Sequence, residues 1–268
     1  MKQTVKNICL ALLWCFMSLH ITAQGVVINK ADGTKDYYKA SEVLSVGVYG
    51  YGENPEPDPG TDPDPNGHEW VDLGLPSGTL WATCNVGANN PEEYGDYFAW
   101  GEIEPKEVYK WETYKYSKDS YNTLTKYCHK SESGYNGFTD NLRELEPEDD
   151  AATANWGSDW QIPSPEQCRE LINSSYITTE WVMQNGINGC KITSKSNGKS
   201  IFLPATGDCY GNSPKKVGTH GYYWLRSNDY DYPSNGQVLW FYEDMNGCSM
   251  NGDGRSWGVT IRPVRIQN

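Results

Sequence analysis

Residues 244–258, DMNGCSMNGDGRSWG, hold the densest group of side chains in this chain that could do chemistry. The stretch combines carboxylates, amides, a thiol and a guanidinium with four glycines. Such a set could bind Ca²⁺, carry a redox-active cysteine, form the rim of a ligand site, or make only solvated turns. The patterns in and around the stretch decide among these four interpretations.

A calcium loop of the EF-hand type needs Asp or Asn at positions 1, 3 and 5, Gly at position 6 and Glu at position 12. Counted from Asp244, position 5 is Cys248 and position 6 is Ser249, so the motif fails. No two cysteines beyond residue 24 stand in a CxxC spacing, which argues against a zinc ribbon. We therefore expect no metal site and no cofactor, with calcium left as an open alternative.

Patterns of catalytic residues are also missing. The sequence contains no G-x-S-x-G elbow, and His68, His129 and His220 share no motif. Cys128 and His129 are adjacent, but neighbouring side chains on a strand point apart, so adjacency does not make a nucleophile and its base. The acidic runs resemble surface and linker, and no carboxylate pair suited to glycoside hydrolysis stands out. The sequence predicts no catalytic residues and a protein that is not an enzyme.

Residues 1–24 have the features of a secretory signal peptide. Lys2 and Lys6 precede an apolar stretch that is too short to span a membrane comfortably, and a cleavage position follows at Ala23 or Gln24. This predicts an exported protein, periplasmic, on the outer surface or secreted, with no membrane insertion after signal cleavage. The remaining six cysteines are even in number, which permits disulfides, but their pairing does not follow from the sequence.

Charge and aromatic content narrow the partners. The formal net charge is −13, so the chain repels phosphate backbones and we expect no nucleic-acid partner. The chain has 19 Tyr and 11 Trp against 5 Phe. Aromatic rings with a polar tip are typical of aromatic-rich β structure, and they would also serve as a stacking surface for sugars.

The order of the remaining segments predicts two modules and a spacer. Residues 25–50 read as a small β-hairpin module, because VVINK and KDYYKA flank the turn ADGT and LSVGVYG can add a third strand. Residues 51–66 form an acidic, Pro-rich linker, since proline at this density cannot enter helix or sheet interiors. Residues 67–268 then form one Gly- and Trp-rich domain.

The clearest helix signal in this domain is WQIPSPEQCRELIN. Ser164 suits the N-cap, Pro165 the first helical position, and Gln167 completes a capping box. Cys168 and Leu171 then share one apolar face, so Cys168 is expected in the core. A second, shorter helix fits EPEDDAATANWG.

Turn residues predict several strands in the same domain. Hairpins are expected around Pro76–Gly78 and around Asn197-Gly198. In GQVLWFYED apolar residues occupy both faces, which predicts a strand buried on both sides. WGVTIRPVRI predicts a final strand with a bulge or sheet edge at Pro263.

Several of these motifs together resemble a known family. VDLGLPSGTLWATCNVGANNPEEYGDYFAWGE, TLTKYC, NWGSDWQIPSPEQCREL, SIFLPATG, GYYWLRS and WGVTIRPVR resemble, in this order over about residues 69–265, the Fibrobacter succinogenes major paralogous domain of exported proteins. That family is similar to the C-type-lectin-like fold and distantly to the formylglycine-generating enzymes. The resemblance implies an α+β fold, a C-type-lectin-like domain with antiparallel sheets, one or two short helices and long irregular loops.

The resemblance also suggests where a ligand would bind. In C-type-lectin-like domains the last strands form a small platform whose loops face the ligand, so GCSMN would be a short strand between turns at Gly247 and GDG. The hypothetical ligand rim comprises Asn228, Asp229, Tyr230, Asp231, Tyr232, Ser249, Asn251, Asp253 and Arg255. The alternative is that these residues only contact water. Structural roles are expected for Trp81, Trp160, Pro163, Ser164, Cys168, Trp224, Trp240 and Trp257.

The cysteines of this chain depart from the family pattern, and this bears on whether a catalytic activity carries over. The formylglycine-generating enzymes depend on a cysteine pair near their C-terminus, where this chain has only Cys248, so that activity does not carry over. Ser117 stands where relatives often carry a cysteine, so Cys128 lacks its usual mate. We expect an exported, non-catalytic module for adhesion or for binding an unidentified glycan or protein. The alternatives are a structural subunit of a surface assembly and an enzyme distantly like the formylglycine-generating enzymes.

Overall fold

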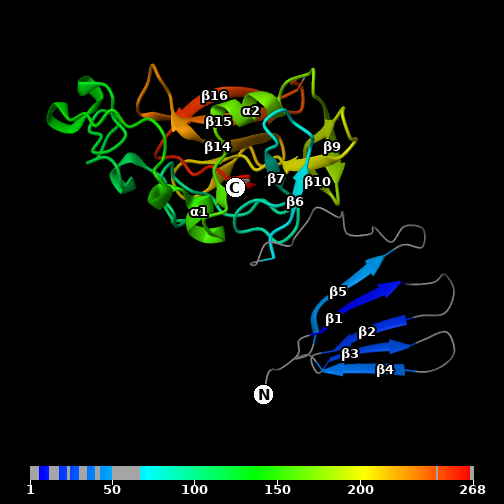
Figure 1. The fold of residues 1–268 in the computed structure, drawn as a ribbon. Coiled ribbons are helices and arrows are strands. Elements are labelled where there is room, and N and C mark those ends of the chain that lie inside the picture. The colour runs from blue at the N-terminus through cyan, green and yellow to red at the C-terminus, as the bar shows by residue number, and fades with distance from the viewer. Residues whose placement is uncertain are drawn as a thin grey trace. The chain divides into compact units, whose positions relative to one another are not determined.

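The computed structural model of the 268-residue chain divides into two compact units, Met1–Asp62 and Pro63–Asn268 (Figure 1). It describes five strands of the first unit by their backbone, and residues 67–245 and 247–265 of the second in full. The linker predicted at 51–66 lies outside the described residues. Within the described part of the chain, no helix is long and apolar enough to cross a membrane.

The first unit consists of β1 (Lys6–Ala11), β2 (Ser18–Thr22), β3 (Gly25–Asn29), β4 (Lys35–Lys39) and β5 (Val43–Tyr49). Strands β3 and β4 pair antiparallel, which confirms the predicted hairpin, and β2 extends this sheet. The third predicted strand, β5, pairs in parallel with β1 instead of joining the hairpin. Strands β1 and β2 lie within the segment predicted as a signal peptide, and its cleavage remains a prediction.

The second unit is mostly antiparallel β structure with two short α-helices, as the sequence predicts at the level of fold class. Its elements are β6 (Trp70–Asp72), β7 (Leu80–Ala82), η2 (Trp111–Thr113), η3 (Ser131–Ser133), η4 (Tyr135–Gly137), η5 (Pro147–Asp149), α1 (Ala151–Trp156), β8 (Trp160–Gln161), α2 (Pro165–Leu171), β9 (Ile177–Gln184), β10 (Ile187–Ser194), β11 (Ser200–Pro204), β12 (Asp208–Cys209), β13 (Pro214–Lys215), β14 (His220–Asn228), β15 (Asn235–Tyr242), β16 (Ser249–Gly254) and β17 (Val264–Arg265).

These strands form four sheets, ordered β6-β7-β17-β8, β11-β10-β9, β12-β13 and β14-β15-β16. All pairings within them are antiparallel. The hairpins predicted around Pro76–Gly78 and Asn197-Gly198 correspond to β6–β7 and β10–β11. The first and last strands of the unit meet in one sheet, because β17 pairs with both β7 and β8.

Both predicted helices are present. In α2, Ser164 Oγ accepts a hydrogen bond from the Gln167 N–H, and the Gln167 side chain accepts one from the Ser164 N–H, which completes the capping box. Cys168 and Leu171 are fully buried, which confirms the core position of Cys168. Helix α1 starts from Asp150, whose carboxylate accepts hydrogen bonds from two backbone N–H groups of the first turn.

Two hydrophobic cores lie on opposite faces of the β14–β15 pair. Trp224 and Val238 belong to the first core, whereas Tyr223 and Leu239 belong to the second, so the alternation along the strands divides them. Of the residues expected to be structural, Trp81, Trp160, Pro163, Cys168 and Trp224 are buried, and Ser164, Trp240 and Trp257 are half-buried.

Three predictions about the C-terminal strands are wrong in part. The final strand begins only after Pro263, because residues 258–260 make single bridges and residues 261–262 make no strand pairing, although residues 259–262 are all buried. The GDG segment is not a turn, since Gly252–Gly254 pair with β15 as the end of β16. Strand β15 is not buried throughout: Trp240 and Tyr242 remain half-exposed, and Trp240 packs only partly buried against the first core.

Candidate ligand-binding site

The register of β14, β15 and β16 collects polar and aromatic side chains on one face of their sheet. His220 pairs with Tyr242, and Tyr222 with Trp240. On the other side of β15, Trp240 pairs with Ser249. Since paired residues point to the same face, the register defines an aromatic face made of His220, Tyr222, Trp240 and Tyr242, bordered by Ser249, Asn251 and Asp253.

The four rings of the aromatic face form a two-by-two array. Ring centroids of Trp240 and Tyr242 are 5.4 Å apart, as are those of His220 and Tyr242. Tyr222 lies 6.1 Å from His220 and 6.5 Å from Trp240, and the interplanar angles between these four neighbouring pairs range from 4° to 28°. His220, Trp240 and Tyr242 are half-exposed, so nearly parallel rings of the array are partly open to solvent.

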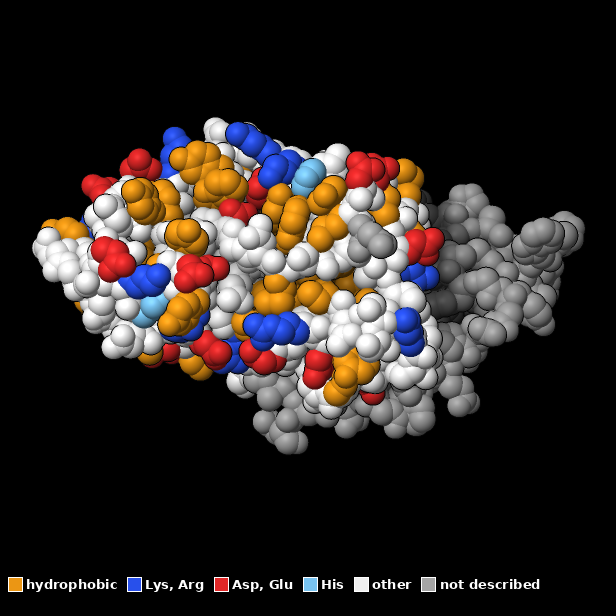
Figure 2. Space-filling model, turned by 90° about the horizontal axis from the view of Figure 1, so that it is seen from above, with side chains coloured by type: hydrophobic (Ala, Val, Ile, Leu, Met, Phe, Trp, Pro, Cys, Tyr) orange, Lys and Arg blue, Asp and Glu red, His pale blue; other side chains and the backbone are white. Residues whose placement is uncertain are grey.

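The surface view agrees with this arrangement. Figure 2 shows the molecule from the side on which β14, β15 and β16 lie in Figure 1, and hydrophobic side chains gather there around a histidine. Lysine or arginine and acidic side chains adjoin the group. Apolar surface rimmed by polar groups is typical of a recognition site.

A lysine and an aspartate cover one side of the array. The Lys216 ammonium donates to Tyr222 Oη at 2.9 Å and to Asp208 Oδ2 at 3.4 Å, and it lies 4.9 Å from the centroid of the Tyr222 ring. Together with its packing in the first core, these contacts leave Tyr222 only 8% exposed, whereas the other three rings are half-exposed. Lys216 and Asp208 therefore bound the site on the side of β12 and β13 (Asp208–Cys209 and Pro214–Lys215).

On this face, the carboxyl group of Asp253 has a pKa above its ordinary value. Burial raises its pKa to about 6, and the neighbouring charge of Asp208 acts in the same direction. The N–H of Gly254, which donates to Asp253 Oδ1 at 2.8 Å, and the Lys216 charge oppose the shift in pKa. A carboxyl that titrates near pH 6 changes the charge of the site between mildly acidic and neutral conditions.

Asp253→Asn is expected to stabilise the protein at pH 7 by about 1 kcal/mol, allowing for the partial exposure of this side chain. The folded-state pKa of about 6 exceeds the reference value of 3.8, so the folded state binds more protons between these two values. Ionisation of Asp253 therefore destabilises the wild type as pH rises through 6. Urea unfolding should show that the free energy of unfolding of Asp253→Asn equals that of the wild type below pH 4 and exceeds it by the full amount above pH 7. The exposed Asp231→Asn variant is the control; an equal gain at every pH for Asp253→Asn would contradict the assignment.

The loop between β14 and β15 holds the exposed part of the predicted rim. Tyr230 and Tyr232 are 64% and 66% exposed. The Asp229 carboxylate accepts hydrogen bonds from the N–H groups of Asp231 and Tyr232, at 2.8 and 2.9 Å, which fixes the turn. A Cβ at Gly252 would lie 3.3 Å from Asp229 Oδ2, so this loop lies beside β16.

Residues from a distant segment hold the same loop in place. The Arg143 guanidinium lies 4.7 Å from the ring centroid of Tyr230, and the His129 ring stacks on that ring at 5.8 Å. His129 Nε2 is 2.8 Å from the Tyr230 carbonyl oxygen, and Lys130 donates to the Asp231 carbonyl at 2.7 Å. The exposed tyrosines therefore stand on a positioned loop.

Two predicted rim residues cannot touch a ligand. Asn228 is fully buried, and its amide donates to the Tyr127 carbonyl at 2.9 Å. Arg255 is also fully buried, because its guanidinium lies against aromatic rings and donates to backbone carbonyls inside the first core. The prediction treated polar residues of this stretch as surface, and these two side chains are instead satisfied within the protein. The predicted residues that reach the surface are Asp229, Tyr230, Asp231, Tyr232, Ser249, Asn251 and Asp253.

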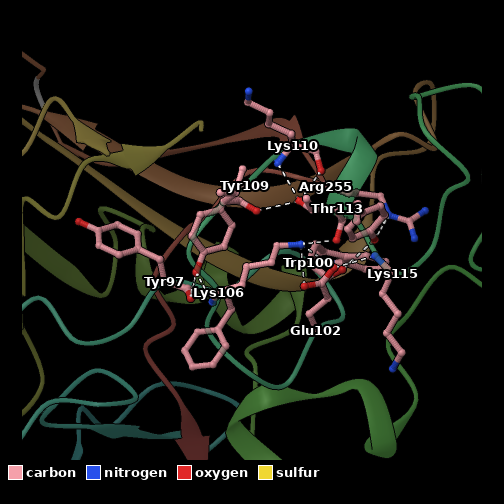
Figure 3. Close-up of polar contacts among 12 residues, drawn as sticks. Tyr97, Trp100, Glu102, Lys106, Tyr109, Lys110, Thr113, Lys115 and Arg255 are labelled. Carbon is pink, nitrogen blue, oxygen red and sulfur yellow. Dashed lines mark hydrogen bonds and ion pairs between the residues drawn. The ribbon is translucent and has the colours of Figure 1, made fainter. Parts of the chain in front are cut away.

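The Arg255 guanidinium packs against aromatic rings instead of pairing with a carboxylate (Figure 3). Its guanidinium carbon lies 4.7 Å from the ring of Trp100 and 5.3 Å from that of Tyr114. Close by, the Lys106 ammonium joins Glu102 and the Thr113 carbonyl, each at 2.9 Å. These contacts order the irregular segment after Trp100, in which the structure has no strand before β8.

Sequence reasoning missed five contributors to the site and gave Trp240 only a structural role. The five are Asp208, Lys216, His220, Tyr222 and Tyr242. A signal was present, since aromatic residues alternate at 220 and 222 and again at 240 and 242. Only the register shows that the two pairs share a face, and register depends on turns far from these residues.

No protein-family model, curated protein or solved structure matches this chain. Within the described residues, no group of three or more His, Cys, Asp or Glu side chains is placed to hold a metal ion. The second unit is thus a β-rich α+β fold with a half-exposed aromatic face on its β14-β15-β16 sheet.

Proposed function

We propose that this chain is an exported, non-catalytic binding module with a C-type-lectin-like domain, and that it recognises carbohydrate on the aromatic face. The observation that carries the proposal is the half-exposed array of His220, Trp240 and Tyr242 beside polar residues of β16. Display at the cell surface or secretion follows from the predicted signal peptide and linker.

The chemistry of the face suits a sugar. One side of a pyranose ring presents C–H groups and its edge presents hydroxyls, so a sugar needs an apolar surface flanked by hydrogen-bonding groups. Trp240 and Tyr242 supply the apolar surface. Asn251, which is exposed, can both donate and accept hydrogen bonds, and Ser249 supplies a hydroxyl beside Trp240.

The arrangement of aromatic residues supports recognition over packing alone. Trp81, Trp100 and Trp224 are at most 1% exposed, whereas Trp240 on the same sheet as Trp224 is left half-exposed. Leaving large rings partly in water forfeits stabilisation of about 25 cal/mol for each Å² of apolar surface. The tyrosine-bearing loop of residues 229–234 lies beside β16 and offers a second contact for a longer ligand.

Trp240→Ala is expected to weaken carbohydrate binding roughly five- to thirtyfold, because one stacked ring contributes about 1–2 kcal/mol. The measurement is a glycan-array screen with the secreted full chain, followed by calorimetric titration of the best glycan. Asn251→Ala should weaken binding of the same glycan, since its hydrogen bonds orient the sugar.

Tyr121→Ala is the matched control, because Tyr121 is an exposed aromatic residue (61%) outside the proposed site. Its binding should equal that of the wild type. Tyr230→Ala tests whether the loop or the aromatic face binds the glycan. Loss of binding only in this variant would show that the ligand binds the loop. Unchanged binding in both Trp240→Ala and Asn251→Ala would contradict the proposed site, and protein capture without glycan binding would contradict the ligand class.

A further inference from the structure

Two cysteines that are 58 residues apart in sequence meet in the second core. Cys190 lies in β10 (Ile187–Ser194), and Cys248 directly precedes β16 (Ser249–Gly254). Their Sγ atoms are 3.4 Å apart. Cys190 is 3% exposed and Cys248 is half-buried, so both thiols face each other within the packed interior.

We propose that Cys190 and Cys248 form a disulfide when the chain folds in the presence of a disulfide oxidant. Each thiol loses its proton and the pair loses two electrons to an oxidised dithiol, which is reduced to two thiols as the Sγ–Sγ bond forms. Export to an oxidising compartment would supply an oxidant of this class. The inference does not depend on which ligand the aromatic face binds.

Only a small movement separates the two thiols from a bond. An Sγ–Sγ bond is about 2.05 Å long, so the atoms must approach by about 1.4 Å. Cys248 lies outside the strand ladder, whose last pair joins Trp240 and Ser249. The preceding Gly247 has φ +108°, a conformation open mainly to glycine, and movement of Cys248 breaks no pair of the β15–β16 ladder.

The other cysteines are less suited to either partner. Cys168 belongs to the same core, and burial raises the pKa of its thiol as it does that of Cys248, so acidity does not select the pair. Position does, because Cys190 Sγ and Cys248 Sγ are 3.4 Å apart. The Cys128 thiol donates to the Lys130 carbonyl at 3.1 Å, and Cys209 packs in the first core. Pairing of Cys190 with Cys248 is therefore favoured by position.

The bond would join two sheets next to the proposed site. It would connect β10 of the β11-β10-β9 sheet to the residue directly before β16, in the sheet that carries the aromatic face. A pocket of about 180 Å³ opens beside Cys190 and is lined also by Thr179, Trp181, Phe241, Tyr242 and Gly247, which gives a small reductant a route to the bond. Tyr242 belongs to both the pocket and the aromatic face, so the bond would limit movement between them.

The test is oxidative refolding of the full chain in reduced and oxidised glutathione, followed by non-reducing peptide mapping. A peptide containing Cys190 should be linked to one containing Cys248, with the loss of two hydrogen atoms. Dithiothreitol should lower the Tm of the oxidised protein by about 10 °C, because the bond closes a long loop. Cys190→Ala and Cys248→Ala should each abolish this sensitivity to the reductant.

Cys209→Ala is the control, since it removes a buried thiol from the other core and should keep the full shift in Tm on reduction. Two results would overturn the proposal. One is alkylation of both Cys190 and Cys248 after oxidative refolding and denaturation without reductant. The other is linkage of either residue to a different cysteine. Glycan binding by the same preparations is scored separately, so failure of the disulfide and failure of the proposed function are distinguishable.

Discussion

Arg255→Ala is expected to lower the free energy of unfolding by about 4 kcal/mol, the largest effect of any substitution considered. The Arg255 side chain is fully buried, and its Nε donates to Tyr114 Oη at 2.8 Å. Its terminal nitrogens donate to the carbonyls of Tyr127, Pro233 and Lys126 at 3.1–3.2 Å. Alanine leaves these acceptors without their donor and opens a void against Trp100, and each such loss costs about 1–3 kcal/mol.

Lysine should not rescue the loss. A lysine ammonium is a point charge with three donors, whereas these acceptors surround a planar guanidinium that also stacks on rings. We expect Arg255→Lys to recover less than half of the free energy of unfolding that is lost in Arg255→Ala. Because Pro233 belongs to the loop that carries Tyr230 and Tyr232, both variants should also increase amide exchange in that loop.

Urea unfolding at pH 7 measures both effects. Arg169→Ala is the matched control, since the Arg169 side chain is 58% exposed and pairs only with exposed Glu166 on α2 (Pro165–Leu171). A surface pair of this kind contributes at most about 0.5 kcal/mol. A loss below 1 kcal/mol for Arg255→Ala would show that the buried guanidinium is not needed for stability.

Local signals explain why part of the fold was predictable. The capping box of Ser164 and Gln167 and the turn at Asn197-Gly198 act within a few residues, so the sequence shows them directly. The continuous run of apolar and aromatic residues in β15 likewise predicted a strand. These features depend on residues that are close together in the chain, so they can be recognised from the sequence alone.

The candidate site depends on distant neighbours, which explains the errors. Arg255 was predicted at the surface because its partners lie more than a hundred residues away, at Tyr114 and Tyr127. Tyr222 and Trp240 share a face only through the register of two strands separated by a loop. Cys248 has no cysteine near it in sequence, although Cys190 is 3.4 Å away in space.

The second large effect is expected at Asp149, where a buried carboxylate holds four side chains together. Its Oδ2 accepts from Tyr127 Oη and from the Lys126 ammonium, each at 2.7 Å. Its Oδ1 accepts from Tyr116 Oη and, at 3.2 Å, from Lys115. The Asp149 side chain is only 3% exposed, so these partners replace the water that a free carboxylate would bind.

This environment sets the pKa of Asp149. Burial alone would raise it, but the hydrogen bonds from Lys126, Tyr116, Tyr127 and Lys115 outweigh burial and lower the pKa to about 2. The pKa values of both tyrosines are raised, with burial as the largest cause and the hydrogen bond to Asp149 acting in the same direction. Ionised Asp149 between protonated tyrosines is thus the stable arrangement at neutral pH.

Asp149→Asn is expected to lower the free energy of unfolding by about 2 kcal/mol at pH 7, because the amide keeps the size of the side chain but cannot balance two ammonium groups. The folded-state pKa of about 2 lies below the reference value of 3.8, so ionised Asp149 stabilises the fold above pH 4. That contribution is lost as pH falls from 4 through 2, and the two proteins should approach equal stability there.

Urea unfolding of wild type and Asp149→Asn between pH 2 and pH 7 tests this dependence. The control is Asp159→Asn, which removes a 43% exposed carboxylate paired with Arg265 at 3.6 Å and should change stability by less than about 0.5 kcal/mol. If the free energy of unfolding of Asp149→Asn stays below that of the wild type by a constant amount down to pH 2, then packing, and not the ionised carboxylate, stabilises this cluster. A deficit that shrinks with acid would show that one charge orders the tyrosine- and lysine-rich segment next to Arg255, since Tyr127 contacts both side chains.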